Sequence, residues 1–448
     1  MRRILIKNAE VVNEGKRIIS DILIVGERIE NISNNISDKN ALVIEGAGLH
    51  LIPGVIDDQV HFREPGLTHK GTIYTESKAA IAGGITSYMD MPNTIPNTLT
   101  QELLEEKYLL AEKYSLANYS FFMGITKDNL EEALKTDTEN VCGITDDGLY
   151  FNSEDGILAD HPDFLEKLFS RTSTLVALHS ENSEIIRQNL EKYKKIYSTN
   201  IPFNLHPMVR SEDACVNATK SILEIANKHQ NRLHLFHIST LAEANLFDNK
   251  LPVRVKRITA EACIHHLWFS DKDYENLESK IKWNPAIKTE EDRDGLLAAL
   301  LNNKLDIIAT DHAPHTMDEK NGNYLQSLSG GPLVQHALPA MLELFHQGKI
   351  SLEKIVEKMS HNVAEIYRIQ ERGYIREGYF ADLVLVNLNM PWTVNLENIL
   401  YKCPWSPFEN QTFKSKVEKT FVNGQLVYDR GIFNETYLGK RLRFSKIR

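Results

Sequence analysis

Residues able to bind a metal ion stand at the carboxyl ends of several short apolar runs in this sequence. Imidazole and carboxylate side chains together form the ligand set of zinc and similar divalent metals. If the runs are parallel strands of one barrel, their carboxyl ends meet at a single mouth, where the active sites of such barrels lie. The sequence therefore predicts a metal site at that mouth. Its candidate ligands are His61, His179, His237 and Asp311.

A further run, residues 141–145, leads into Asp146-Asp147-Gly148, and either carboxylate could join the same site. Each residue alone is a weak signal, because a single histidine is usually a hydrogen-bonded core or surface residue and an Asp-Asp-Gly is usually a solvated turn. The shared position after strand-like runs is what favours metal binding. The remaining histidines are interpreted as structural, among them His161, His229, His234 and His346.

Three polar residues follow other runs and could bind a substrate. Arg63 stands in Arg-Glu-Pro-Gly, Asn93 in Met-Pro-Asn-Thr and Asn284 in Trp-Asn-Pro. A guanidinium can hold a carboxylate through two parallel hydrogen bonds, and an amide side chain can both donate and accept. The alternative is an exposed arginine beside a Pro-Gly turn and two ordinary turn asparagines, so these residues point to an anionic substrate without proving one.

The elements that must position these residues alternate between strand and helix patterns. Eight apolar runs predict strands at residues 55–61, 85–91, 119–125, 141–145, 174–179, 233–238, 253–258 and 305–310. Helical patterns occupy residues 72–82, 101–114, 158–169, 211–229, 290–302 and 332–345. This alternation favours a parallel sheet with helical crossovers, and eight strands are what a closed (β/α)₈ barrel requires. An open doubly wound sheet remains the alternative, although no Gly-x-Gly-x-x-Gly dinucleotide motif follows a strand.

Both ends of the chain have a different, β-rich pattern. Short apolar runs at residues 4–6, 22–25 and 41–44 are matched by runs at 381–386, 417–422 and 425–428, the last two joined by Asn423-Gly424, a hairpin signal. This symmetry predicts that the two termini pair into one small β domain. Two unrelated flanks are the alternative.

Composition excludes several classes of protein. The 448 residues are 42% hydrophobic and 25% charged, which is typical of globular proteins and excludes disordered, collagen-like and coiled-coil chains. A net charge of −10 argues against broad binding of nucleic acid or anionic membranes. The four cysteines form no C-x-x-C motif, and we find no secretory or membrane-spanning run, so we expect a cytoplasmic protein with reduced thiols. A homodimer is possible.

A series of motifs resembles the dihydroorotases of the amidohydrolase superfamily along essentially the whole chain. The opening signature is PGVIDDQVHFREPG at positions 53–66, followed by THK at 68–70. The others follow in the family's order: GGIT at 83–86, MPNT at 91–94, TDDG at 145–148, HSEN at 179–182, HIST at 237–240, NPAI at 284–287, TDHAPH at 310–315 and SPF at 406–408. REPG, MPNT and TDHAPH together are specific.

The resemblance implies a (β/α)₈ TIM-like barrel at residues 53–372 and a β-sandwich formed by residues 1–52 and 373–448. It implies reversible hydrolysis of (S)-dihydroorotate to N-carbamoyl-L-aspartate in pyrimidine biosynthesis. The matched metal ligands, for one or two Zn²⁺ ions, are His61, Asp147, His179, His237 and Asp311. Asp146 is the alternative to Asp147. Asp311 also matches the catalytic residue that acts as both base and acid. The matched substrate-binding residues are Arg63, Asn93, Asn284 and His315.

One position departs from the family pattern. The first histidine of the usual His-x-His is Gln59, whose neutral amide is a weaker zinc ligand than imidazole. Gln59 could still coordinate, the enzyme could work with one metal, or the chain could be a catalytically silent homologue with a structural role. A hydantoinase-, dihydropyrimidinase- or allantoinase-like enzyme is a further alternative. The polar segment 319–330 is either a mobile flap over the mouth or an ordinary loop.

Overall fold

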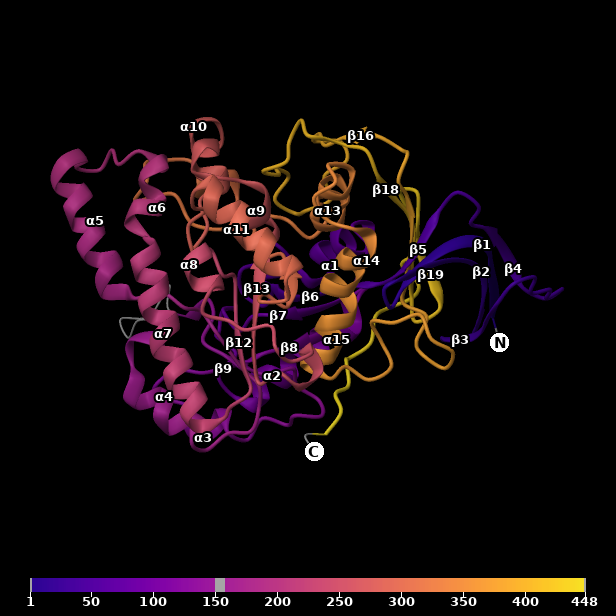
Figure 1. Cartoon of the computed structure of the whole chain (residues 1–448), viewed down its shortest axis with the longest axis horizontal. Helices are drawn as coiled ribbons and strands as arrows, with labels where there is room; N and C mark the ends of the chain where they lie inside the picture. Colours follow the sequence, from indigo (N-terminus) through magenta and orange to yellow (C-terminus); the bar gives the residue numbers. More distant parts are fainter. Residues whose placement is uncertain (1, 150–157, 447–448) are drawn as a thin grey trace.

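Parallel strands in the middle of the chain form a closed ring. The computed structural model describes residues 2–149 and 158–446 (Figure 1). Eight strand positions are found in this described part: β6 (Val55–Val60), β7 (Ile85–Asp90), β8 (Asn118–Phe121) continued by β9 (Met123–Gly124), β10 (Ile144–Thr145), β11 (Val176–Leu178), β12 (Leu233–Leu235), β13 (Ile258–Cys263) and β14 (Ile307–Ala309). Neighbours pair in chain order, and a parallel bridge from Val60 to His312 closes the ring. The predicted barrel is confirmed, and closure excludes an open sheet.

The predicted position of the seventh strand was wrong. Residues 253–258 were expected to form it, but Val253–Val255 is a 3₁₀ turn and the strand is β13, which starts at Ile258. The alternating apolar and basic residues of the earlier segment imitate a half-exposed strand, and Val255 is 53% exposed. The true strand escaped detection because it carries Glu261 at its centre, in a position that burial normally reserves for apolar side chains.

Helices cover the barrel as the sequence predicted, with polar residues capping their first turns. The six expected helices are α1 (Ile73–Ala82), α2 (Gln101–Tyr114), α4 (Pro162–Phe169), α7 (Glu212–His229), α11 (Glu290–Leu301) and α13 (Ala337–His346). Thr72, Thr100, Ser211 and Thr289 accept backbone hydrogen bonds at the starts of four of them. The prediction missed the longer α5 (Ser183–Tyr197), whose described residues are never fully buried.

Shorter helices complete this layer. They are α3 (Leu130–Ala133), α6 (His206–Val209), α8 (Leu241–Ala244), α9 (Ile264–Trp268), α10 (Tyr274–Leu277), α12 (Met317–Lys320), α14 (Leu352–Val356) and α15 (Asn362–Tyr367). Among the described residues, no helix combines the length and the apolar character needed to cross a membrane.

The two ends of the chain meet in one nine-stranded sheet beside the barrel, at the right of Figure 1. Its strands are β1 (Arg3–Asn13), β2 (Lys16–Val25), β3 (Arg28–Ser33), β4 (Leu42–Glu45), β5 (His50–Pro53), β15 (Leu383–Asn387), β18 (Lys416–Val422), β19 (Gln425–Asp429) and β20 (Ile432–Phe433). The antiparallel pair β5 and β15 joins the two ends, which confirms a shared β domain and excludes two unrelated flanks. A separate two-stranded ribbon pairs β16 (Trp392–Thr393) with β17 (Thr412–Phe413). The predicted domain limits at residues 52/53 and 372/373 stay predictions.

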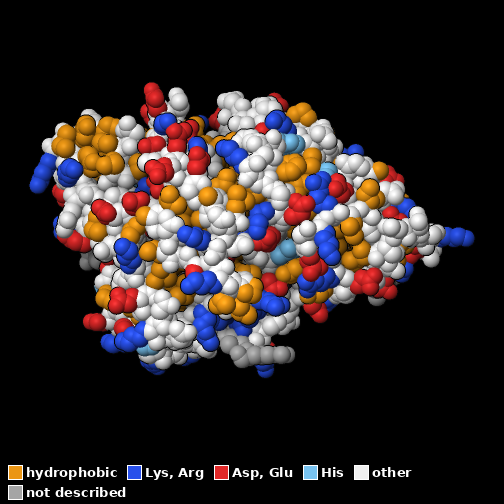
Figure 2. Space-filling model, viewed as in Figure 1, with side chains coloured by type: hydrophobic (Ala, Val, Ile, Leu, Met, Phe, Trp, Pro, Cys, Tyr) orange, Lys and Arg blue, Asp and Glu red, His pale blue; other side chains and the backbone are white. Residues whose placement is uncertain are grey.

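Charges of both signs are mixed over the surface. On the face shown in Figure 2, lysine and arginine side chains alternate with aspartate and glutamate rather than gathering into one basic field. Hydrophobic side chains gather at the upper left of that view, over α5 and α6, where Ile196, Tyr197 and Met208 are exposed.

Candidate metal centre and substrate pocket

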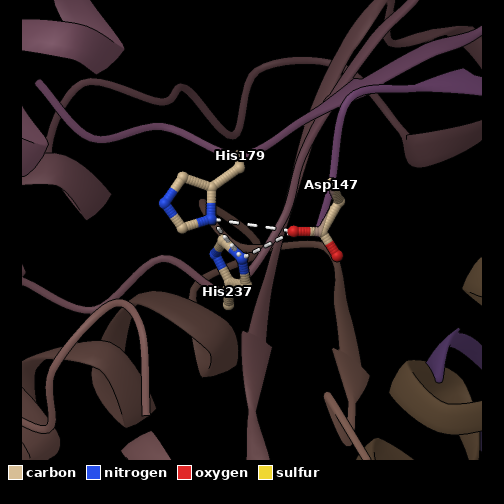
Figure 3. Close-up of side chains that lie close together, drawn as sticks. All are labelled: Asp147, His179 and His237. Carbon is tan, nitrogen blue, oxygen red and sulfur yellow. Dashed lines mark hydrogen bonds and ion pairs between the residues drawn. The ribbon is translucent and has the colours of Figure 1, made fainter. Parts of the chain in front are cut away.

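Three predicted ligands converge at the carboxyl ends of neighbouring barrel strands (Figure 3). Asp147 follows β10, His179 follows β11 and His237 follows β12. His179 Nδ1 lies 3.0 Å from His237 Nε2, and each of these nitrogens lies 3.7 Å from Asp147 Oδ1. All three side chains are buried. Two imidazole nitrogens and one carboxylate oxygen thus face a common point, which is a donor set suited to a divalent metal.

Charged neighbours set the protonation of this cluster. His179 Nε2 donates to Glu181 Oε2 at 2.8 Å, so His179 Nδ1 is left to face Asp147 and His237. Glu181 is in turn ion-paired with Arg210. Burial alone would raise the pKa of Asp147, but hydrogen bonds from His179 and His237 hold it well below its ordinary value, so the carboxylate is ionised. Burial lowers the pKa of His179, yet Asp147 and Glu181 raise it to about 9.

The adjacent aspartates have different partners. Asp146 Oδ1 accepts from the backbone N–H of His179 at 3.2 Å, and its Oδ2 accepts from the N–H of Leu158 at 3.0 Å. Asp146 therefore fixes the backbone of the strand ends, while Asp147 alone of the two reaches the histidines.

His61 and Asp311 form the opposite side of the centre. His61 Nε2 lies 3.1 Å from Asp311 Oδ1 and 3.4 Å from Asp147 Oδ2, and its Nδ1 lies 2.8 Å from Asn93 Oδ1. The ring thus donates Nδ1–H to Asn93 and turns Nε2 toward the two carboxylates. His237, Asp311 and Arg63 all have positive φ, of 37°, 47° and 70°, which is uncommon outside glycine and clusters at functional sites.

Gln59 occupies the place of the missing histidine without offering its oxygen to the centre. Its Nε2 donates to Asp147 Oδ2 at 3.2 Å, and its Oε1 accepts from Cys263 Sγ at 3.4 Å. The side chain is fully buried. In this arrangement the amide steadies the Asp147 carboxylate, as a neighbouring donor rather than as a ligand.

A cavity of about 280 Å³ opens beside the centre and brings the predicted substrate residues to it. Its polar lining includes His61, Arg63, Asn93, Asp147, Asn284, Asp311 and His315. Arg63 is buried, and its Nε donates to the carbonyl of Pro314 at 3.1 Å. This hydrogen bond orients the guanidinium toward His315, whose Nε2 lies 3.3 Å from Arg63 Nη2. Asn284 Oδ1 is buried and has no hydrogen-bond partner in the described part of the chain, as expected of a group that binds a ligand.

Lys70 also lines the cavity, and sequence reasoning did not assign it. Its Nζ lies 2.9 Å from Glu319 Oε1 and 3.2 Å from His315 Nδ1. Because the ammonium donates to Nδ1, the neutral His315 ring carries its hydrogen on Nε2, which lies 3.0 Å from the carbonyl of Ser329. Burial holds the pKa of His315 well below its ordinary value. The hydrogen bond to Glu319 raises this pKa, but the positive charges of Arg63 and Lys70 lower it further. The signal available in the sequence was the THK motif, which follows REPG after one residue.

The segment 319–330 is an anchored loop in this structure. Buried Lys320 donates from Nζ to the carbonyls of Leu328 and Gly330 at 2.7 and 2.8 Å. Lys282, also buried, donates to the carbonyl of Tyr324 at 2.7 Å. Leu328 and Gly330 line the cavity, so this loop forms one wall of the pocket.

Comparison with known proteins identifies the family. The model of the amidohydrolase family matches residues 50–427. A dihydroorotase of Ehrlichia canis is 32% identical, with 94% of each chain covered, and one of Methanosphaera stadtmanae is 30% identical over 95% of this chain and 96% of its own. An allantoinase of Deinococcus radiodurans is 32% identical over 98% of both chains.

Solved structures agree on the fold. The L-hydantoinase of Arthrobacter aurescens superposes with a TM-score of 0.89 at 23% identity, over 97% of this chain and 98% of that one. The dihydropyrimidinase of Brevibacillus agri gives 0.87 at 22% identity, over 99% and 100% of the two chains. With the family match, the relatives and the strand-end centre taken together, this chain belongs to the amidohydrolase family, whose members are metal-dependent.

Proposed function

We propose that this protein is a dihydroorotase, a cyclic amide hydrolase that converts (S)-dihydroorotate reversibly into N-carbamoyl-L-aspartate in pyrimidine biosynthesis. One observation carries the proposal. A single cavity has the buried guanidinium of Arg63 on one wall, and on another it has the imidazole of His61 with the carboxylates of Asp147 and Asp311. Dihydroorotate has both features that these walls suit, a carboxylate and a ring amide. Relatives named dihydroorotase support this assignment.

Arg63 binds the substrate carboxylate and sets the orientation of the ring. A guanidinium gives two parallel donors, and its burial removes competition from water. His315 lines the cavity beside it, and Asn93 and Asn284 supply amide groups for the ring's polar edge. Asn284 Oδ1 in particular is free to accept a ring N–H.

The donor set fits a divalent metal, and zinc is our proposal for it. Asp147, His179 and His237 would hold the ion, with His61 and Asp311 beside it for a second. When bound, the metal supplies Lewis acidity that polarises the scissile carbonyl and makes water a strong nucleophile near neutral pH. The residues need no rearrangement to present two imidazole nitrogens and a carboxylate oxygen.

Asp311 moves the proton. Its carboxylate accepts a proton from the water that attacks the ring carbonyl carbon, and then gives the same proton to the ring nitrogen as the carbon–nitrogen bond breaks. In the synthetic direction the steps reverse: Asp311 takes a proton from the nitrogen that attacks and returns it to the departing water. His61, 3.1 Å from Asp311 Oδ1, holds the carboxylate in place.

Allantoinase is the second candidate, because relatives of that name match at equal identity. Allantoin has no carboxylate, so a buried Arg63 beside His315 would lack its partner in that reaction. The catalytically silent alternative rests on Gln59 alone, whereas the other residues of the centre are in place.

A substrate panel separates these candidates. Purified protein in zinc-containing buffer is offered dihydroorotate, allantoin, hydantoin and dihydrouracil, and ring opening is measured by chromatography. Dihydroorotate should be cleaved fastest, and N-carbamoyl-L-aspartate should be cyclised in the reverse assay. Faster cleavage of allantoin would support the second candidate, and no turnover of any substrate would support a silent homologue.

Cytoplasmic location and assembly as a homodimer stay predictions. The exposed apolar side chains over α5 and α6 support self-association, since contiguous apolar surface marks interaction sites. Light scattering should give twice the chain mass of 51.1 kDa for a dimer, and Met208→Glu should shift it toward the monomer.

A further inference from the structure

A second cluster of metal-ligand type lies inside the barrel, away from the cavity. Asp58 of β6, His234 of β12 and Glu261 of β13 offer donor atoms that all lie within 4.8 Å of one another. His234 Nε2 is 3.0 Å from Glu261 Oε2 and 3.5 Å from Asp58 Oδ2. All three side chains are fully buried. None of them lines the pocket that holds the proposed active site.

The hydrogen bonds of Thr259 fix which nitrogen of His234 carries the proton. When Thr259 Oγ1 donates to the carbonyl of Leu233, 3.3 Å away, it accepts from His234 Nδ1 at 2.9 Å. His234 Nε2 therefore presents a bare lone pair to the carboxylates of Asp58 and Glu261. Metal-bound histidines are oriented in the same way, through a hydrogen bond from the second ring nitrogen.

Two carboxylates and a lone pair repel one another unless positive charge lies between them. Within the described residues, neither Asp58 nor Glu261 forms an ion pair with a lysine or arginine. Asp58 Oδ2 accepts from Tyr367 Oη at 2.8 Å, but its buried Oδ1 has no hydrogen-bond partner among the residues that the structure describes. An isolated buried carboxylate is costly, so the cluster must take up either protons or a cation.

We propose that Asp58, His234 and Glu261 bind a divalent metal ion of the zinc class in the closed centre of the barrel. Two carboxylates and a divalent ion sum to zero charge, which removes the cost of burial. Ligands at about 2.0–2.1 Å in tetrahedral geometry stand about 3.3 Å apart, close to the 3.0 and 3.5 Å separations seen here.

The site has a structural role. Glu261 Oε1 accepts from the backbone N–H of His237 at 3.1 Å, so the ion would brace the strand end that carries an active-site ligand. The rings of Phe236 and Tyr367 pack against His234, with ring centroids 5.5 and 6.1 Å away, and Glu261 Oε1 also lies 3.6 Å from Cys263 Sγ. The ion would enter during folding and exchange slowly.

Metal analysis of neutral isosteres tests the proposal independently of catalysis. Glu261→Gln and Asp58→Asn copy the shape of a protonated acid, so both should be tolerated if protons occupy the cluster. If a metal does, each variant should lose one equivalent of metal per chain and unfold at a lower temperature. Asp147→Asn is the matched control, because it should lose metal only from the mouth.

Equal metal content in wild type and both isosteres, with unchanged unfolding temperatures, would overturn the proposal. If the variants do not fold, anomalous scattering from wild-type crystals grown with zinc decides the matter. A peak between the three side chains supports the proposal, and a peak at the mouth without one in the centre refutes it. Neither result depends on whether dihydroorotate is the substrate.

Discussion

The barrel holds two clusters built from the same side-chain types, one at its mouth and one at its centre. The mouth cluster has two imidazoles and one carboxylate, Asp147, and it opens onto the cavity. The central cluster has one imidazole, His234, and two carboxylates, and it is buried beside aromatic rings. The mouth is surrounded by charged partners such as Glu181, whereas the centre is held by the hydroxyls of Thr259 and Tyr367.

This difference assigns separate roles to similar chemistry. Access to substrate and charged neighbours that fix protonation suit the mouth to catalysis. A closed environment with neutral hydrogen-bonding neighbours suits the centre to holding strands together. Ligand type alone does not distinguish a catalytic site from a structural one; the path to solvent and the next layer of contacts do.

The largest expected effect comes from metal removal. A chelator added to folded protein should abolish turnover of dihydroorotate, because the cavity gives it a path to the mouth. Metal at the centre should remain, since Asp58, His234 and Glu261 are fully buried and do not line that cavity. Metal content and activity are followed together over time. Loss of all metal in a single phase would break the distinction between the two clusters.

Asp311→Asn should lower kcat by roughly 10²–10⁴-fold, because the amide cannot accept the proton that catalysis requires. The isosteric side chain should leave the unfolding temperature nearly unchanged, unlike Glu261→Gln at the centre. Steady-state kinetics and thermal unfolding measure the two effects. Near-normal turnover would remove Asp311 from the catalytic role.

Arg63→Ala should reduce kcat/KM for dihydroorotate by roughly 10–150-fold, the equivalent of about 1.5–3 kcal/mol for hydrogen bonds to a charged group. Dihydrouracil has the same ring without the carboxylate, so its hydrolysis should change little. Arg63→Lys, which keeps the positive charge but not the two parallel hydrogen-bond donors, serves as the matched control. An equal loss with both substrates would contradict the role of Arg63 in binding the carboxylate.

Lys70→Met should raise KM for dihydroorotate about fivefold, from the loss of about 1 kcal/mol in one hydrogen bond that fixes His315. The effect should fall on KM rather than kcat, because Lys70 acts through a substrate-binding residue. Lys70→Arg should restore most of the affinity. A change confined to kcat would place Lys70 elsewhere in the mechanism.

Gln59→His should have the smallest effect, tightening metal binding at the mouth on the order of tenfold, because an imidazole replaces a neutral amide near Asp147. Titration against a competing chelator measures the affinity. The central ion should not respond. An unchanged metal affinity at the mouth would show that Gln59 already supports metal binding as well as a histidine would.

Much of the architecture was predictable because it depends on periodicity. Alternating strands and helices gave the barrel, and matched β-rich ends gave the shared sheet. The seventh strand failed because its polar residue, Glu261, is stabilised by His234 and by the backbone of His237, partners distant in sequence. Pattern reasoning assumes that a buried strand position is apolar, and here a buried polar network overrides that rule.

The same limit explains the interpretation of His234 as an isolated structural histidine. Strand β6 has register shifts between Asp57 and Val60, so consecutive residues Asp58 and Gln59 both reach partners across the barrel. Regular alternation would have turned one of them outward. A bulge of this kind depends on pairing with the neighbouring strand and leaves no signal in local sequence.

The sequence by itself determined the type of barrel, the strand ends that carry the donors and the family motifs, because these follow from spacing along the chain. Only the tertiary structure decided that Asp147 rather than Asp146 meets the histidines, that Gln59 turns its donor to Asp147, and that Lys70 sets the hydrogen of His315. Those outcomes depend on separations of about 3–4 Å between atoms of segments far apart in the sequence. Such separations are fixed by register and packing across the whole barrel.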